Sequence, residues 1–115
     1  IRRMRFAGFA RCLFEEQKFD SDPERRFAVL LEDEDGADPV ERWVKPGPGV
    51  LRIDHANGET YEPDFVVETR ARKYLCEVKA TDALADADVQ QKARAAALWC
   101  RHATDHELAH DGKPW

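Results

Sequence analysis

Apolar residues near the start of the chain recur with the period of a helix. Residues 2–18 carry one at every third or fourth position, which predicts an amphipathic helix. A second helix is expected across residues 24–33, because Ser21 and Glu24 match a capping box and Pro23 falls in the first turn. Both helices should bury one face against the rest of the domain. The apolar positions of the first helix are Phe6, Phe9, Ala10, Leu13 and Phe14.

The middle of the chain changes to short apolar runs, several of them with a period of two, which is typical of strands. An Asn57-Gly58 pair between two of these runs is a strong signal for a hairpin turn. The runs therefore predict strands that pair antiparallel with their neighbours. Their ranges are 40–44, 50–54, 59–68 and 73–80.

A last helix is expected to begin near Asp88, which has Gln91 three residues later in the spacing of a capping box. The order of helices, strands and a final helix predicts an α+β fold, in which helices flank a mainly antiparallel sheet of three or four strands. At 115 residues, the chain fits one domain across residues 1–115. One face of the last helix carries Val89, Ala93, Ala96 and Cys100.

The two central strands predict a specific register. If residues 69–72 form a four-residue hairpin loop, residue 68 pairs with residue 73 and Asp64 lies directly across from Glu77. Because side chains alternate between the two faces of a strand, Lys79 then shares the face of both carboxylates. The opposite face is apolar and consists of Phe65, Val67, Tyr74, Cys76 and Val78.

Two carboxylates ~5 Å apart on one face of a sheet destabilise it unless something compensates their charge. A divalent cation does so, and carboxylate oxygens favour Mg²⁺, with Mn²⁺ as a substitute. Lys79 lies two residues after Glu77 and can act on a water beside such a metal. Asp64, Glu77 and Lys79 are therefore candidate catalytic residues.

This arrangement resembles the PD-(D/E)xK nuclease superfamily, with Asp64 after a proline as its first element and the run Glu77-Val78-Lys79 as its second. The resemblance implies a restriction-endonuclease-like core. In such a core, Asp64, Glu77 and the backbone carbonyl of Val78 bind the metal, and Lys79 orients the attacking water. It also implies a further acidic ligand from the preceding helix, for which Glu24 is the best match.

The same resemblance implies a polar or basic residue on the last helix that faces the site and contacts DNA. Gln91 and Lys92 are the candidates, and Lys92 is preferred. Each of these additional roles has an ordinary alternative. The capping box explains Glu24 without any chemistry, and a lysine on a helix is most often a solvated surface residue.

A closer likeness, over residues 14–115, is to the C-terminal nuclease region of the restriction subunit of type III restriction enzymes. It implies a DNA endonuclease with an N-terminal helicase domain and a modification methyltransferase subunit as partners. The chain begins with Ile1 and has no GxxxxGK[ST] loop, so ATP is expected to act only through a helicase part outside this sequence. Ala80 stands where the family often has glycine, and the family's last strand is lacking. The matching segments are FDSDPERRFAVLL, VERWVK, YEPDFVV, YLCEVKATD and KARAAALWC.

The net charge of −5 argues mildly against a nucleic-acid partner, but the charges are unevenly distributed. Residues 32–41 hold six acidic residues, and the remainder has 17 acidic against 18 basic residues. Arg70, Arg72 and Lys73 crowd the predicted hairpin tip and are candidate phosphate contacts. A solvated surface accounts for them about as well.

Cysteine and hydropathy patterns favour a cytoplasmic protein. Cys12, Cys76 and Cys100 are odd in number and lack a CxxC spacing, so reduced thiols are expected. No apolar run has the length of a membrane span, and no signal-peptide pattern opens the chain. Histidines at every fourth position from 102 to 110 favour a solvated helix face over a zinc site, because no third ligand of the right kind is near in sequence.

Two alternatives to a DNA endonuclease remain open at this point. One is a catalytically inactive nuclease fold that binds DNA or a partner subunit. The other is an interaction domain on which the carboxylates are surface groups. An intact set of Asp64, Glu77 and Lys79 favours the enzyme, because like charges that only destabilise a sheet have no reason to be kept.

Overall fold

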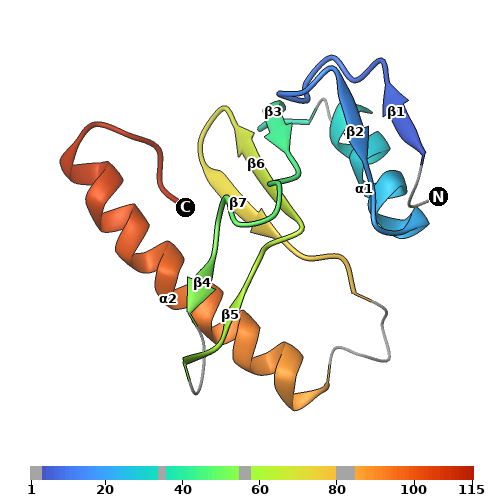
Figure 1. Cartoon of the computed structure of the whole chain (residues 1–115). Helices are drawn as coiled ribbons and strands as arrows, with labels where there is room; N and C mark the ends of the chain where they lie inside the picture. Colours follow the sequence, from blue (N-terminus) through green and yellow to red (C-terminus); the bar gives the residue numbers. More distant parts are fainter. Residues whose placement is uncertain (1–3, 34–35, 55–57, 80–84) are drawn as a thin grey trace.

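The computed structural model describes residues 4–33, 36–54, 58–79 and 85–115 (Figure 1). These residues form an α+β structure with two helices and small antiparallel sheets. The sequence predicts this fold class from the order of its helical and strand-like hydrophobic patterns. The helices are α1 (Asp22–Asp33) and α2 (Ala87–Ala109). The strands are β1 (Arg5–Ala7), β2 (Glu16–Lys18), β3 (Val40–Val44), β4 (Ile53–Asp54), β5 (Thr60–Tyr61), β6 (Phe65–Thr69) and β7 (Lys73–Cys76).

The central sheet has three strands in the order β3-β6-β7, and all its neighbours are antiparallel. Glu68 pairs with Lys73 and Phe65 with Cys76, so the predicted hairpin register is confirmed. Two further antiparallel pairs, β1 with β2 and β4 with β5, stand apart from this sheet. The three-stranded core and the register follow from the alternation of apolar residues in β6 and β7.

The core lies between α1 and one face of the central sheet. Trp43, Phe65 and Phe19 are each no more than 1% exposed. Their rings contact one another, with centroid separations of 5.8 Å between Trp43 and Phe65 and 6.3 Å between Phe19 and Phe65. Ala28 and Leu31 of α1 pack against these rings and belong to the same buried cluster. Truncation of one such buried aromatic side chain costs ~3–5 kcal/mol.

The capping box at the start of α1 is confirmed. The Ser21 hydroxyl oxygen accepts a hydrogen bond from the backbone N–H of Glu24 at 3.4 Å, and the hydroxyl donates to the Glu24 carboxylate at 3.2 Å. Asp22 in the first turn pairs with both Arg25 and Arg26 at 2.8 Å. The Ser21 contacts satisfy the Glu24 N–H at the helix start and fix the position of Glu24.

The helix expected across residues 2–18 is wrong for the described part, which forms the β1–β2 hairpin and a connecting loop. Gly8 has φ +89°, a conformation that interrupts a helix. The loop then hydrogen-bonds to the sheet: the Leu13 N–H donates to the Trp43 carbonyl at 3.0 Å, and the Trp43 N–H to the Arg11 carbonyl at 2.9 Å. Backbone pairing with β3 therefore overrides the helical spacing of the phenylalanines.

The strands expected at 50–54 and 59–68 are shorter than predicted. Only Ile53 and Asp54 form a strand in the first run. The second run is split into β5 and β6 by a break that contains Pro63, which has no N–H to donate to a sheet. Of the expected turn between the runs, Asn57 lies outside the described residues and Gly58 has φ +74°.

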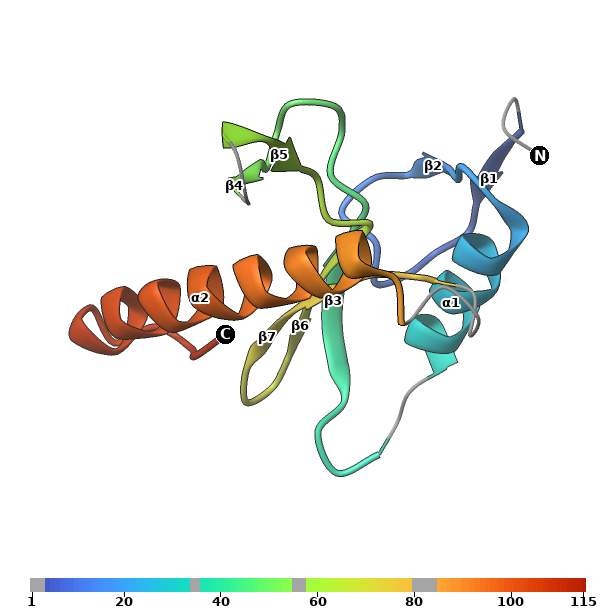
Figure 2. The same ribbon diagram turned by 90° about the horizontal axis from the view of Figure 1, so that it is seen from below.

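Helix α2 lies on the opposite side of the β6–β7 hairpin from α1 (Figures 1 and 2). In Figure 2 it runs between the β4–β5 hairpin and the β6–β7 hairpin. Its N-cap is Asp86, whose side chain makes no capping hydrogen bond, so the capping box expected at Asp88 and Gln91 does not form. Neither helix in the described part of the chain combines the length and apolar character needed to cross a bilayer.

The C-terminal residues return to the sheet and cover its edge at β7. The Lys73 N–H donates to the Pro114 carbonyl at 2.8 Å, and the Lys113 amine binds the Glu68 carboxylate at 2.6 Å. Trp115 meets Trp99 of α2 edge to face, with ring centroids 4.8 Å apart. The tail therefore links the sheet to α2.

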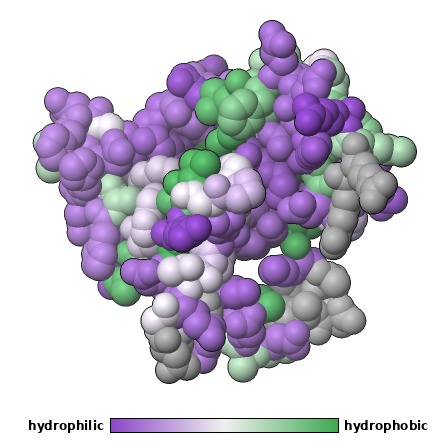
Figure 3. All heavy atoms as spheres, viewed as in Figure 1, coloured by the Kyte–Doolittle hydropathy of each residue, from purple (hydrophilic) through white to green (hydrophobic). Residues whose placement is uncertain are grey.

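The molecular face shown in Figure 3 is largely hydrophilic, and its apolar side chains form small separate groups. Leu13, Phe14 and Leu30 are among the exposed apolar residues of the chain, each more than half exposed. Scattered exposed apolar residues are normal on a protein surface. These exposed residues therefore do not by themselves mark a functional site.

Candidate functional site

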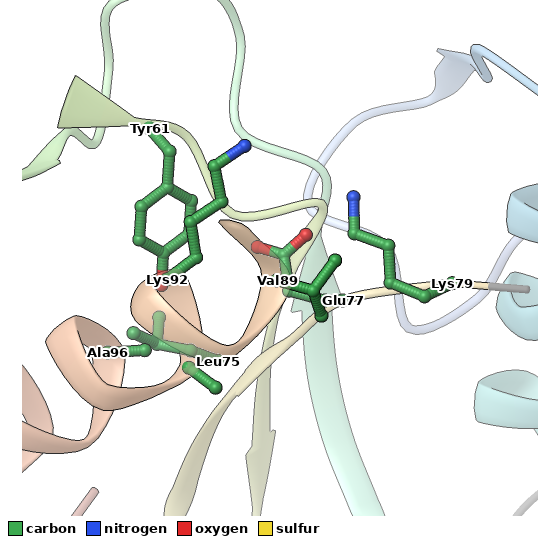
Figure 4. Close-up of a pocket in the computed structure, with 8 residues that line it drawn as sticks. Tyr61, Leu75, Glu77, Lys79, Val89, Lys92 and Ala96 are labelled. Atoms are coloured by element: carbon green, nitrogen blue, oxygen red, sulfur yellow. The ribbon is translucent and has the colours of Figure 1, made fainter. Parts of the chain in front are cut away.

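A cavity of about 400 Å³ lies where β5, the end of β7 and the first turns of α2 meet (Figure 4). Tyr61 reaches it from β5, and Leu75 and Glu77 from β7 and the residues after it. Its size is typical of small-molecule sites in proteins. The residues around it are Tyr61, Leu75, Glu77, Lys79, Val89, Lys92, Ala93 and Ala96. It therefore includes two of the three candidate catalytic residues.

Asp64 lies beside Glu77 but does not itself line this cavity, and the backbone fixes its carboxylate. Its Oδ2 accepts a hydrogen bond from the Val78 N–H at 3.0 Å. The strand ladder ends at the pair Phe65–Cys76, and Asp64 and Glu77 lie one residue beyond it, just outside β6 and β7. The alternation in β6 and β7 thus brings the two carboxylates together, as the hairpin register predicts.

The second carboxylate is held in a setting that disfavours its charge. Loss of surrounding water raises the pKa of Glu77 from its usual 4.5 to about 8, and the charge of Asp64 and a hydrogen bond to that residue add to the shift. Lys79 acts in the opposite direction. The residue as a whole remains exposed, so water still reaches it. At neutral pH, Glu77 therefore keeps its proton in most molecules.

Two lysines flank this acidic pair. Figure 4 shows the Glu77 carboxylate between the side chains of Lys79 and Lys92. Lys92 is anchored by Asp88 one turn away, at 3.1 Å, and its amine lies 6.0 Å from the centre of the Tyr61 ring. Gln91 is exposed and does not line the cavity. Of the two helix residues that the resemblance implies, Lys92 is the one at the site.

Glu24, the third implied acidic ligand, has other partners. It is buried, with its Oε1 2.6 Å from the Lys45 amine and its Oε2 bound by Ser21. Among the described residues, no three His, Cys, Asp or Glu side chains are grouped closely enough to hold a metal ion. The carboxylates that the structure brings together near Lys79 are therefore those of Asp64 and Glu77.

Lys45 is a residue that the sequence did not single out. Its side chain is only 12% exposed, and its amine binds Glu24 and, at 3.2 Å, Asp20. Burial lowers its pKa, but the hydrogen bonds and charges of these two acids outweigh burial and raise it. Lys45 and Asp64 line a second hollow of about 320 Å³. The available signal was the position of Lys45 directly after the apolar pair Trp43-Val44 and before a run of Pro and Gly.

The basic hairpin tip lies far from the cavity. Arg70 is six residues from Asp64 along one strand, which is ~20 Å at 3.3 Å per residue. Arg70 and Arg72 are exposed, and the guanidinium of Arg72 lies 5.9 Å from the Tyr74 ring centre. Lys73 is paired with Glu107 at 3.3 Å. Any DNA contact at the tip is therefore separate from the cavity and involves the arginines more readily than Lys73.

The remaining candidates have ordinary surroundings. All three cysteines are free and partly buried, and burial raises the pKa of each thiol. Such thiols are poor nucleophiles and poor metal ligands. The rings of His106 and His110 stack at 4.3 Å on the exposed face of α2. Tyr74, expected on the apolar face, is 41% exposed.

Comparisons with known proteins provide no relative to this chain. A scan against protein-family models found no match, and searches of curated proteins and of solved structures found none either. The chemistry of the site must therefore be inferred from its own residues.

Proposed function

We propose that this domain is a metal-dependent DNA endonuclease of the PD-(D/E)xK type, as in type III restriction enzymes. The observation that carries the proposal is the proximity of the Asp64 carboxylate to Glu77, which lines a cavity together with Lys79. A sheet gains nothing from two like charges at neighbouring positions. The proposal extends to a restriction-endonuclease-like core built on β6, β7 and the helix α1.

The donor set fits a hard divalent cation. Loss of water and the neighbouring Asp64 raise the pKa of Glu77 despite the opposing charge of Lys79, and a bound cation would favour the charged carboxylate there. Asp64, Glu77 and the Val78 carbonyl would hold Mg²⁺ or Mn²⁺. Bound there, the ion would polarise a phosphodiester and lower the pKa of a water molecule.

The residues of the chain supply the other requirements of phosphodiester hydrolysis. Glu77 must release its proton before both carboxylates act as ligands. The affinity of the site for a metal ion should therefore increase as the pH rises towards 8. The Lys79 amine donates hydrogen bonds to the attacking water or to a phosphate oxygen. Lys92 offers a second positive charge to the phosphate from the opposite side of Glu77. The Val78 N–H orients Asp64 throughout.

One observation favours the alternative of an inactive nuclease fold that binds DNA or a partner subunit. Glu24 is neutralised by Lys45, so the acid that the family often adds is engaged elsewhere. Two carboxylates and a carbonyl still leave coordination positions for water, as Mg²⁺ prefers. The complete set of Asp64, Glu77 and Lys79 therefore favours the enzyme.

The test is strand cleavage of supercoiled plasmid and of circular single-stranded DNA with Mg²⁺ or Mn²⁺. We expect cleavage by the parent domain and its loss in Asp64→Asn and Lys79→Ala. Asp105→Asn and Arg101→Ala change matching charges at exposed positions of α2 and should cleave as the parent does. Cleavage that survives in the site variants, or none by the parent while DNA binding persists, would favour the inactive module.

A further inference from the structure

The cavity has two chemically different halves. Glu77, Lys79 and Lys92 form a charged rim. Leu75 of β7 together with Val89 and Ala96 of α2 forms an apolar wall below them. Hydrolysis of a phosphodiester needs the rim, but it does not need an apolar wall. The wall therefore points to a further group of the substrate that follows the phosphate into the cavity.

A nucleobase fits this description. Enzymes that take a base out of its stack receive it between apolar or aromatic side chains, and the cost of a few kcal/mol for unstacking is smallest where the base is already unpaired. A cavity of about 400 Å³ has the dimensions of a small-molecule site. Bases in a continuous duplex are stacked and paired, so their faces are unavailable to such a wall.

We propose that the cavity receives one unstacked nucleotide of single-stranded DNA, with its base against the α2 wall and its phosphate between Lys79 and Lys92. The cleavage substrate is then DNA with an unpaired nucleotide at the scissile position, such as a single strand or a flap. The cleavage part of this inference rests on the proposed endonuclease function, whereas the binding part stands without it.

The position of Lys92 supports this arrangement. Asp88 and the Tyr61 ring hold its amine at the rim of the cavity. Tyr61 itself is only 8% exposed, so its ring contacts Lys92 but is not accessible for a base to stack on. The base must therefore lie against the aliphatic side chains of the wall. These side chains cannot form hydrogen bonds with the edges of the base. Binding should depend little on base identity.

The test is DNA binding by the Asp64→Asn protein with EDTA present, so that no cleavage occurs. The probe is a fluorescein-labelled oligonucleotide of mixed sequence, alone or annealed to its complement. Ala96→Leu fills the space beside the apolar wall. Ala97→Leu adds the same atoms at an exposed neighbouring position outside the cavity. Thermal unfolding shows whether Ala96→Leu is folded, and Ala93→Leu, at an exposed position of the same wall, replaces it otherwise.

We expect the single strand to bind at least tenfold more tightly than the duplex. Ala96→Leu should weaken single-strand binding by about tenfold, or ~1.4 kcal/mol, because the larger side chain occupies space that the base would fill. Ala97→Leu should stay within about twofold of its parent, while Lys92→Ala should weaken binding of both forms of DNA. Equal or tighter duplex binding, or an Ala96→Leu variant that binds the single strand normally, overturns the inference.

The two proposals fail in different ways. Single-strand preference and sensitivity to Ala96→Leu, without metal-dependent cleavage, would retain the nucleotide cavity and remove the nuclease. Cleavage that depends on Asp64 and Lys79, together with a preference for duplex, would retain the nuclease and remove the nucleotide cavity.

Discussion

The Val78 N–H donates a hydrogen bond to the Asp64 carboxylate across 3.0 Å. This bond joins the residue before β6 to the residues after β7, beyond the last pair of the strand ladder. Asp64 therefore has a structural task in addition to any chemical one. A substitution that tests its chemistry has to preserve the acceptor.

Asp64→Asn and Asp64→Ala should accordingly differ in stability. The asparagine keeps an oxygen for the Val78 N–H and removes the repulsion with Glu77, so we expect unchanged or slightly higher stability at pH 8. Alanine also relieves the repulsion but leaves the N–H without its partner. It should be less stable than the asparagine variant by ~1 kcal/mol. Urea unfolding at pH 8 without divalent metal measures the difference, and identical midpoints would contradict the role of the bond.

The stability of the metal-free domain should fall as the pH rises from about 5 to 8. The pKa of Glu77 is raised in the folded state to about 8, whereas the unfolded chain releases this proton near 4.5. The folded state therefore binds more protons in this interval, and ionisation of Glu77 above it disfavours folding. Thermal unfolding at a series of pH values between 5 and 9 measures the slope.

Glu77→Gln isolates this contribution. The amide cannot ionise, so the downward slope between pH 5 and 8 should flatten and the variant should exceed the parent in stability at pH 8. Glu16→Gln removes a carboxylate from the exposed hairpin partner β2 and should leave the slope as in the parent. An unchanged slope in Glu77→Gln would show that the carboxylate is not held in its protonated form.

Metal binding should appear as a pH-dependent gain in stability. An ion that binds only the folded state stabilises it by ~2.7 kcal/mol at a hundredfold excess over its dissociation constant, which is about 10 °C in Tm for a domain of this size. Mn²⁺ has to displace the proton of Glu77, so the gain should be larger at pH 8 than at pH 6.

The same unfolding experiment on variants identifies the site of the ion. Asp64→Asn and Glu77→Gln should lose most of the Mn²⁺ gain, while Asp105→Asn on the exposed face of α2 should keep it. Glu24→Gln provides a further comparison, because its carboxylate is bound to Lys45 and not to the pair. A gain that persists in Asp64→Asn would place the ion elsewhere.

The central hairpin could be predicted because the residues that determine its pairing lie close together in the sequence. The apolar alternation in β6 and β7 and the short loop between them define the register, so Asp64 and Glu77 could be paired from the sequence alone. Helix α1 was equally accessible, because Ser21 and Glu24 form a capping box that the structure confirms. Local signals of this kind do not depend on distant parts of the chain.

The contacts that could not be predicted join distant segments. The phenylalanines near residues 6–9 have helical spacing, but they pack on Phe19 and Trp43, and the following loop pairs with β3. The ion pair between Lys45 and Glu24 joins residues 21 positions apart. The sequence around Lys45 or around Glu24 does not indicate the other residue, because the tertiary fold decides which charges are buried together.

This ion pair provides the last prediction. The two side chains are 12% and 6% exposed, so removal of one partner leaves a charge with little water around it. Lys45→Met should destabilise the domain by ~3 kcal/mol, at the lower end of the range for broken buried pairs, because Ser21 still donates to Glu24. Glu24→Gln should cost less, because Lys45 retains Asp20 at 3.2 Å.

The asymmetry between the two variants is the informative result. Urea unfolding at pH 7 should rank the parent as most stable, then Glu24→Gln, then Lys45→Met. Lys18→Met removes a lysine from the exposed strand β2 and should stay within about 0.5 kcal/mol of the parent. If Glu24→Gln proved as costly as Lys45→Met, Asp20 would contribute nothing to holding the amine. The buried pair would then consist of Lys45 and Glu24 alone.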